Sequence, residues 1–196
     1  MTISSAAAGQ TILGHMVFET ALGFVGIAWS ATGLTRLSLF QRDRAAVERR
    51  LERLGVAGPG TAEQAAPAWV AALVGEIKSY AEGEEIDFTG VPVDLAGVDD
   101  FRLAIYAAAR RLAYGETTTY GELANRAGHG GLPRETGQAL GANPVPLVIP
   151  CHRILAAGGK IGGFSAPGGS TTKEKMLALE GVRTGPPPAP QQSFAF

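Results

Sequence analysis

Asn143-Pro-Val-Pro-Leu-Val-Ile-Pro-Cys-His-Arg153 joins a short apolar run to the only cysteine in the chain. Leu147-Val-Ile149 is flanked by prolines, which predicts a short buried strand. Cys151 directly follows Pro150, whose ring would hold the thiol in one place. A thiol with a pKa of about 8.5 is only slightly ionised at neutral pH, although the thiolate is the nucleophile. The stretch therefore indicates cysteine chemistry that needs a neighbouring base.

His152 and Glu180 are the residues best placed to activate this thiol. His152 can take the proton through a water molecule, because neighbouring residues of an extended segment point to opposite sides. Such a base needs an orienting acid. Glu180 ends a predicted helix, where a carboxylate opposes the helix dipole at a cost of about 0.3–1 kcal/mol. A solvated Glu180 and an inert, buried Cys151 stay open as alternatives.

Two short helices joined by a glycine-rich turn are predicted before this stretch. The first covers 119–127 and begins with a capping box, in which Thr119 and Glu122 satisfy orphan N–H groups reciprocally. The second begins at Pro133, where a missing N–H costs nothing, and ends near Asn143. This pair predicts a helix-turn-helix, a motif that also occurs in many proteins that do not bind DNA.

Arg134 falls in the first turn of the second of these helices. The helix dipole disfavours a cation there, and Glu135 compensates only in part. An arginine aimed outward at this position would be useful for entering DNA. An ordinary solvated arginine fits the same position.

The other predicted elements suggest a small α/β domain and two further helices. Strands are expected at Phe18–Thr20, Phe24–Trp29 and Leu34–Phe40, and helices over 43–54 and from Pro67 to about Ala81. An extended linker over Gly90–Gly97 leads to a helix with Phe101, Ile105 and Ala109 on one face. The last helix is expected near 172–180, with a second capping box at Thr171–Glu174 and Gly181 as its terminator. The expected division is a flexible N-terminus (1–14), an N-terminal α/β domain (15–89), a C-terminal domain (90–183) and a disordered Pro/Gln-rich tail (184–196).

Composition limits the class of protein. The chain has 196 residues, of which 45% are apolar and 18% charged, which suits one large or two small folded domains. Residues 1–90 hold 7 basic and 10 acidic residues, whereas residues 91–181 hold 9 and 8, so the second half could contact a few phosphates. One cysteine excludes an internal disulfide and a multi-cysteine zinc site, so no metal site is expected. With no signal-peptide pattern and no apolar run of about 18 residues, we expect a cytoplasmic protein without membrane contact.

Three stretches resemble the O6-alkylguanine-DNA alkyltransferases. The run from Asn143 to Arg153 closely resembles the active-site signature of that family. Tyr114-Gly-Glu-Thr-Thr-Thr-Tyr120 and Gly162-Gly-Phe-Ser165 also match in type, order and spacing. The resemblance is good over about residues 90–181 and weak over 15–89.

The resemblance implies an α+β fold. It consists of a small N-terminal α/β domain of the ribonuclease H-like type and a mainly helical C-terminal domain with a helix-turn-helix. The implied partner is double-stranded DNA that contains O6-alkylguanine, bound through the minor groove by a monomer. The implied activity is repair by direct reversal: the damaged base is flipped out and its alkyl group passes irreversibly to Cys151, without a cofactor.

The same resemblance assigns roles to individual residues. Cys151 is the alkyl acceptor, His152 and Glu180 form its activating relay, Asn143 organises the turn, and Tyr120 assists flipping and contacts the base. The implied DNA-binding residues are Arg134, which fills the gap in the stack, with Tyr120, Thr119 and Arg153. The implied base pocket consists of Leu140, Phe164, Ser165 and the backbone at Ile154.

The sequence departs from the family pattern in a few places, and other functions stay open. Ala166-Pro167 is inserted after Ser165, Phe164 replaces a common tyrosine, and Glu135 brings a negative charge to the second helix. One alternative is a non-catalytic lesion-binding protein of the same fold, although such relatives replace the cysteine. Others are a Cys-His hydrolase, which would turn over repeatedly, and a structural or redox protein with an inert thiol.

Overall fold

The N-terminal part of the chain forms an antiparallel sheet in the order β1-β2-β3. The computed structural model describes residues 11–58, 60 and 65–183. Its strands are β1 (Gly14–Thr20), β2 (Gly23–Trp29) and β3 (Leu34–Gln41). The three predicted strands are confirmed, and β1 begins earlier than expected.

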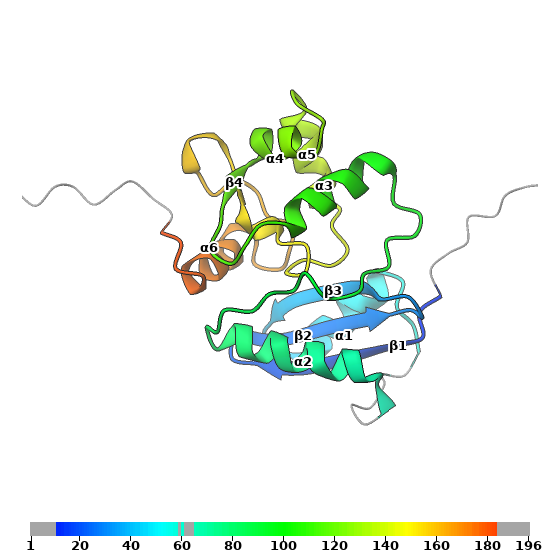
Figure 1. Cartoon of the computed structure of the whole chain (residues 1–196). Coiled ribbons are helices and arrows are strands. Elements are labelled where there is room, and N and C mark those ends of the chain that lie inside the picture. The colour runs from blue at the N-terminus through cyan, green and yellow to red at the C-terminus, as the bar shows by residue number, and fades with distance from the viewer. Residues whose placement is uncertain (1–10, 59, 61–64, 184–196) are drawn as a thin grey trace, which may run out of the picture.

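The two helices of this part cover opposite faces of the sheet (Figure 1). Helix α2 (Ala68–Ala81) packs on the face that carries Ile27 and Trp29. Helix α1 (Arg44–Arg53) covers the other face, where Ala28 packs in a smaller apolar cluster. Both helices were predicted from their residue patterns. The period-2 alternation of β2 thus supplies apolar side chains to both layers.

The C-terminal part is mainly helical and lies above one edge of the sheet in Figure 1. Its elements are α3 (Asp100–Arg110), β4 (Thr118–Thr119), α4 (Tyr120–Arg126), α5 (Pro133–Gly141), η2 (Cys151–Arg153), β5 (Ile154–Leu155), η3 (Ala157–Gly159) and α6 (Gly169–Leu179). Strands β4 and β5 pair in parallel. The molecule is therefore of the α+β class, as expected.

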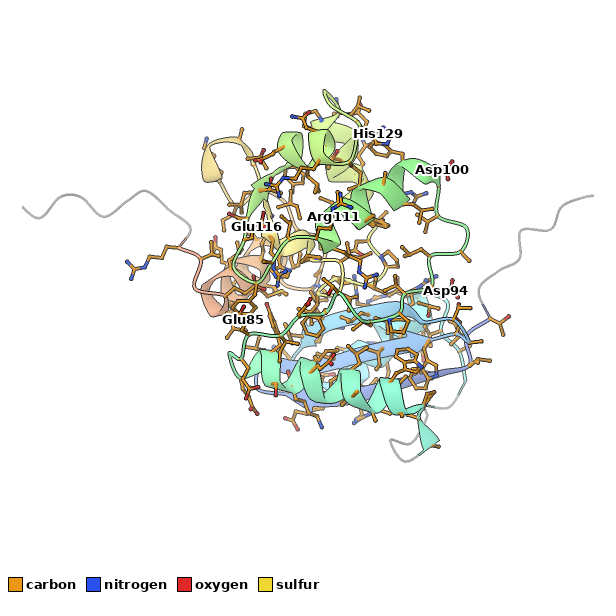
Figure 2. The ribbon with its side chains drawn as sticks, viewed as in Figure 1. Glu85, Asp94, Asp100, Arg111, Glu116 and His129 are labelled. Carbon is orange, nitrogen blue, oxygen red and sulfur yellow. The ribbon has the colours of Figure 1, made fainter. Side chains whose placement is uncertain are left out.

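The two parts share one hydrophobic core. Buried residues of the sheet and of α2 belong to the same cluster as Ile105, Leu123 and Met176. The edge of β3 is covered, because Leu34 N–H donates to Pro92 and Leu37 N–H donates to Pro144. The segment 90–97 that follows this edge carries Asp94, at the junction of the two parts (Figure 2).

The expected domain division at residue 90 stays a prediction. The predicted flexible N-terminus is described only from residue 11, and Gly14 already belongs to β1. The predicted tail over 184–196 lies outside the described residues.

The two predicted capping boxes have different outcomes. Thr119 accepts the N–H of Glu122 at 3.2 Å, as expected, but the Glu122 carboxylate binds Arg126. The second capping box is wrong, because α6 begins at Gly169 after Gly168, whose φ of 82° is left-handed. The N-cap of α6 makes no side-chain hydrogen bond, and the Thr172 hydroxyl donates to Pro167 instead.

Candidate active site

A turn organised by Asn143 positions the cysteine. The Asn143 Oδ1 accepts the N–H of Val145, and its Nδ2 donates to the carbonyl oxygen of Ile149 at 2.9 Å. Leu147 has a φ of 79°, so the apolar run bends back on itself. The predicted strand at 147–149 is therefore wrong, although the run is buried as expected.

Cys151 begins the short helix η2 (Cys151–Arg153), which also corrects the extended conformation expected for Cys151 and His152. Its side chain is buried, and its Sγ lies 3.4 Å from Asn143 Nδ2. Burial raises the pKa of the thiol. The hydrogen bond from Asn143 and the charge of Lys173 act in the opposite direction. The thiol thus has nearby groups that favour its ionised form.

Glu180 is the centre of a buried polar network behind the cysteine. Gly181, with a φ of 74°, ends α6 as predicted and leaves Glu180 at the helix C-terminus. The Glu180 carboxylate accepts from His152 Nε2 at 2.8 Å, from Tyr80 at 3.0 Å and from the N–H of Gly115 at 3.1 Å. Burial alone would raise the pKa of Glu180, but hydrogen bonds and charges from His152 and Arg153 lower it to about 2. The network therefore holds a carboxylate anion.

His152 joins this network to the region of the thiol. It is fully buried, and burial lowers its pKa, although the hydrogen bond to Glu180 acts the other way. Its Nδ1 is buried and has no hydrogen-bond partner among the described residues. A neutral ring that donates Nε2–H to Glu180 has a lone pair on Nδ1 and can accept a proton there.

Arg153 belongs to the same network, and this corrects the expected DNA contact. Its side chain is only 6% exposed. Nε and Nη2 donate to the Glu180 carboxylate, and Nη1 donates to Leu112 O at 2.8 Å. A guanidinium bound on this many sides cannot reach a phosphate.

A cavity of about 390 Å³ opens in front of the thiol. It gathers four of the predicted site residues around Cys151, and its lining consists of Tyr120, Gly137, Leu140, Gly141, Cys151, Gly163, Phe164 and Ser165. Tyr120 O–H donates to Gly163 O at 3.4 Å, which links helix α4 to the loop before α6. We call this space the base cavity.

Lys173 is a residue of the site that the sequence analysis missed. It is fully buried in α6, where its Nζ donates to Ile154 O at 2.5 Å and to Gly163 O at 3.5 Å. Burial lowers its pKa to about 8, while the charge of Cys151 acts to raise it. The sequence contains a signal for its burial: Lys173 lies three and four residues before the apolar Met176 and Leu177, and this helical spacing places it on the buried face of α6.

The contact to Lys173 involves the backbone of Ile154, another of the predicted site residues. Its side chain is fully buried and does not line the base cavity. The Ile154 carbonyl oxygen accepts a hydrogen bond from the lysine and keeps a second lone pair, so reading of the base by the backbone around Ile154 stays a prediction.

The predicted DNA-facing residues lie on α4 and α5. Arg134 is exposed in the first turn of α5, and Thr119 is half-buried as the N-cap of α4. His129 of the intervening turn packs edge-on against Phe101 of α3, with ring centroids 4.9 Å apart (Figure 2). This contact anchors the turn on the rest of the molecule.

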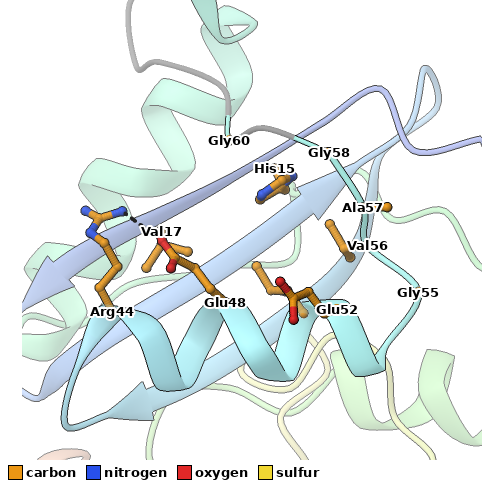
Figure 3. Close-up of a pocket in the computed structure, with 11 residues that line it drawn as sticks. His15, Val17, Arg44, Glu48, Glu52, Gly55, Val56, Ala57, Gly58 and Gly60 are labelled. Carbon is orange, nitrogen blue, oxygen red and sulfur yellow. Dashed lines mark ion pairs between the residues drawn. The ribbon is translucent and has the colours of Figure 1, made fainter.

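A larger cavity, of about 510 Å³, lies between α1 and β1 (Figure 3). His15, Glu48 and Glu52 line it, and Arg44 pairs with Glu48 at 4.0 Å. The cavity contains no nucleophile aligned with a base, so its size does not make it the reactive site. Within the described residues, no group of three His, Cys, Asp or Glu side chains could hold a metal ion, and no helix could cross a membrane.

Comparisons with known proteins agree on one family. The family model "6-O-methylguanine DNA methyltransferase, DNA binding domain" matches residues 100–182. A methylated-DNA–protein-cysteine methyltransferase from Methanothermobacter thermautotrophicus is 32% identical over 158 residues, which are 81% of this chain and 80% of the relative.

Solved structures give the same result. The crystal structure of Mycobacterium tuberculosis OGT in complex with DNA has a TM-score of 0.67 at 29% identity, covering 86% of this chain and 92% of that chain. An O6-methylguanine-DNA methyltransferase from Pyrococcus kodakaraensis has a TM-score of 0.63 at 26% identity, covering 86% and 99%. The similarity thus extends over the sheet as well as the helical part, and the region that the family model matches contains Cys151, His152 and Glu180. The chain therefore belongs to the methylated-DNA–protein-cysteine methyltransferase family.

Proposed function

We propose that the protein repairs O6-alkylguanine in double-stranded DNA by moving the alkyl group irreversibly to Cys151. The observation that carries this proposal is the position of the only cysteine, which lies at the wall of the base cavity in front of the His152–Glu180 pair. A thioether has no leaving group, so each protein molecule acts once.

The thiol is activated by His152. Its unpartnered Nδ1 takes the thiol proton through a water molecule, while Glu180 holds the ring and stabilises the imidazolium. The positive charge of Lys173 favours the thiolate that remains. Asn143 orients the sulfur by donating to it.

The transfer is a displacement at the alkyl carbon. The bond from Sγ to carbon forms as the bond from carbon to O6 breaks, and the electron pair passes to guanine. Guanine is a poor leaving group as an anion, so it needs a donor near O6. Tyr120, which lines the base cavity, exchanges its long hydrogen bond to Gly163 O for a proton or hydrogen bond to O6, and the backbone N–H of Ser165 can add another. Leu140 and Phe164 provide the apolar walls.

Helices α4 and α5 act as a helix-turn-helix that docks in the minor groove. The exposed Arg134 enters the base stack and fills the space left by the flipped nucleotide, at an unstacking cost of a few kcal/mol. Thr119, the N-cap of α4, contacts the sugar–phosphate backbone of the DNA. Glu135 is also exposed in the first turn of α5, next to Arg134.

The same proposal extends to the rest of the molecule. The sheet part is of the ribonuclease H-like type, the active species is a monomer in the cytoplasm, and the reaction requires no cofactor.

The experiment is a titration of the protein with a duplex that carries one O6-methylguanine. We expect guanine to be restored up to one equivalent per protein and no further. Cys151→Ala should bind the duplex but restore none. Repeated turnover would contradict the proposal and favour a hydrolase, and binding without restoration by the unaltered protein would favour a lesion-binding role.

A further inference from the structure

A second cleft, of about 470 Å³, adjoins the base cavity at the junction of the sheet part and the helical part. Its walls come from β3, the C-terminal end of α1, the segment 96–98 and the turn after α5. Gly141 and Ser165 line both spaces. We call this second space the junction cleft.

One residue of the junction cleft wall contacts the reacting sulfur. Asn143 lines the cleft, and the Nδ2 of this residue lies 3.4 Å from Cys151 Sγ. In the displacement, the sulfur, the transferred carbon and O6 are roughly in line, so any further substituent on that carbon points sideways. Because Gly141 and Ser165 line both spaces, a substituent directed toward these two residues would point to the junction cleft.

The junction cleft carries a concentrated positive charge. Arg36 from β3 and Arg50 and Arg53 from α1 line it, and none of the other residues that line it is acidic. Arg36 is held in place because its Nε and Nη1 donate to the carbonyl oxygens of Leu54 and Thr35. Three guanidinium groups facing a cleft without a carboxylate favour an anion.

Arg50 is the clearest sign of a missing partner. Its Nε is buried and has no hydrogen-bond partner among the described residues. Burial lowers the pKa of Arg50, and the like charge of Arg53 lowers it further, although an arginine stays protonated. Both arginines lie in the last turn of α1, where the helix dipole also favours cations. A favourable interaction with the helix dipole does not explain why the Nε donor of Arg50 is buried without an acceptor.

We propose that the junction cleft receives the outer part of extended O6 substituents and favours those that end in an anion such as a carboxylate. This inference rests on the proposed function and names its substrate class. The bonds formed and broken are those of methyl transfer. The thiol proton goes to His152, the electron pair goes to guanine, and the anionic end of the substituent does not react.

The test compares two free bases of similar size and opposite charge, O6-(4-carboxybenzyl)guanine and O6-(4-aminomethylbenzyl)guanine. At low salt the protein should react faster with the carboxylate by roughly tenfold, because each partly exposed charge pair changes the rate ratio by a factor of up to about five. Arg50→Gln combined with Arg53→Gln should bring the ratio toward one. Arg53→Glu should reverse the preference, so that the aminomethyl compound reacts faster. Arg49→Gln is the matched control, since Arg49 is an exposed residue of α1 that does not line the cleft.

The outcomes separate this inference from the proposed function. A ratio near one for the unaltered protein, or a ratio that the double variant leaves unchanged, overturns the inference. It is also overturned if the double variant leaves the ratio intact but reduces the salt dependence of duplex binding, since the cleft would then hold a DNA phosphate. Repair of O6-methylguanine in duplex DNA should be unaffected in all variants. Its absence from the unaltered protein would instead contradict the proposed function.

Discussion

At the scale of single residues, Glu180 holds the proposed base in place. It receives hydrogen bonds from His152, Arg153, Tyr80 and Gly115, which belong to distant parts of the sequence. An anion removed from water is stable only when such donors surround it. The same carboxylate therefore serves both the proposed activation of the thiol and the stability of the fold.

The first prediction concerns Glu180→Gln and stability in acid. The folded pKa of Glu180 is about 2, below the ordinary value of 4.5, so its stabilisation is complete above about pH 4.5 and is lost as the pH falls toward 2. This linkage contributes on the order of 3 kcal/mol at neutral pH. Urea unfolding from pH 7 to 2.5 should show a shallower acid decline in the variant. Glu122→Gln, at an exposed pair with Arg126, should change the curve little. Parallel curves for Glu180→Gln and the unaltered protein would refute the linkage.

The second prediction concerns Lys173→Met and the pH dependence of transfer. The lysine charge lowers the pKa of the Cys151 thiol, so its removal should raise that pKa and move the rate profile to higher pH. At neutral pH, transfer from free O6-benzylguanine should slow by roughly tenfold, as expected when one charge-assisted interaction is lost. Lys173→Arg should recover the pH midpoint in part, and Lys175→Met, on the exposed side of α6, should leave it in place. A slower Lys173→Met with an unshifted midpoint would indicate a purely structural lysine.

The sequence allowed a prediction of Cys151 and His152, because they are adjacent after a rigid proline in a family signature, and of Glu180, because its carboxylate opposes a helix dipole. It did not allow a prediction of the state of Arg153 or Lys173. The partner of Arg153 lies 27 residues away, and a charged residue is exposed unless such a partner is known. Burial of these cations follows from the tertiary arrangement.

At the scale of elements, the periodic helices and strands were predictable and the irregular connections were not. Helix α2 has apolar residues at helical spacing, and β2 alternates between two apolar layers. The run 147–149 has the composition of a strand, but Asn143 supplies its hydrogen bonds locally and Leu147 adopts a left-handed conformation. Side-chain to backbone bonds of this kind compete with regular structure.

The third prediction concerns Arg134→Ala in α5. Because its proposed role is to fill the gap left by a flipped base, repair of duplex O6-methylguanine should fall by about a hundredfold, equivalent to a few kcal/mol of unstacking. Reaction with free O6-benzylguanine, which requires no flipping, should stay within about twofold. Arg49→Ala on the distant helix α1 is the control. An equal loss with both substrates would remove the finger assignment.

At the scale of the whole molecule, the sheet part and the helical part are joined by packing and by backbone hydrogen bonds. The edge of β3 binds both the segment before α3 and the turn that carries the site. Residues of both parts belong to one buried cluster. The sequence indicated a boundary near residue 90 from its extended, Pro- and Gly-containing segment, but it could not show that the core continues across that boundary.

The fourth prediction follows from this shared core. Calorimetry should give one unfolding transition, with a calorimetric enthalpy equal to the van 't Hoff enthalpy. The unfolding curve from tryptophan fluorescence, which reports on Trp29 in the sheet and Trp69 in α2, should coincide with the far-ultraviolet curve, to which the helices of both parts contribute. Two separated transitions would show that the parts unfold independently.

The most direct measurement for the whole account is peptide mass spectrometry after reaction with duplex O6-methylguanine. We predict one added methyl group, on the peptide that contains Cys151 and on that sulfur alone, in an amount equal to the guanine restored. Methyl groups on another residue, or restored guanine without a methylated protein, would contradict the claim that this thiolate is the acceptor.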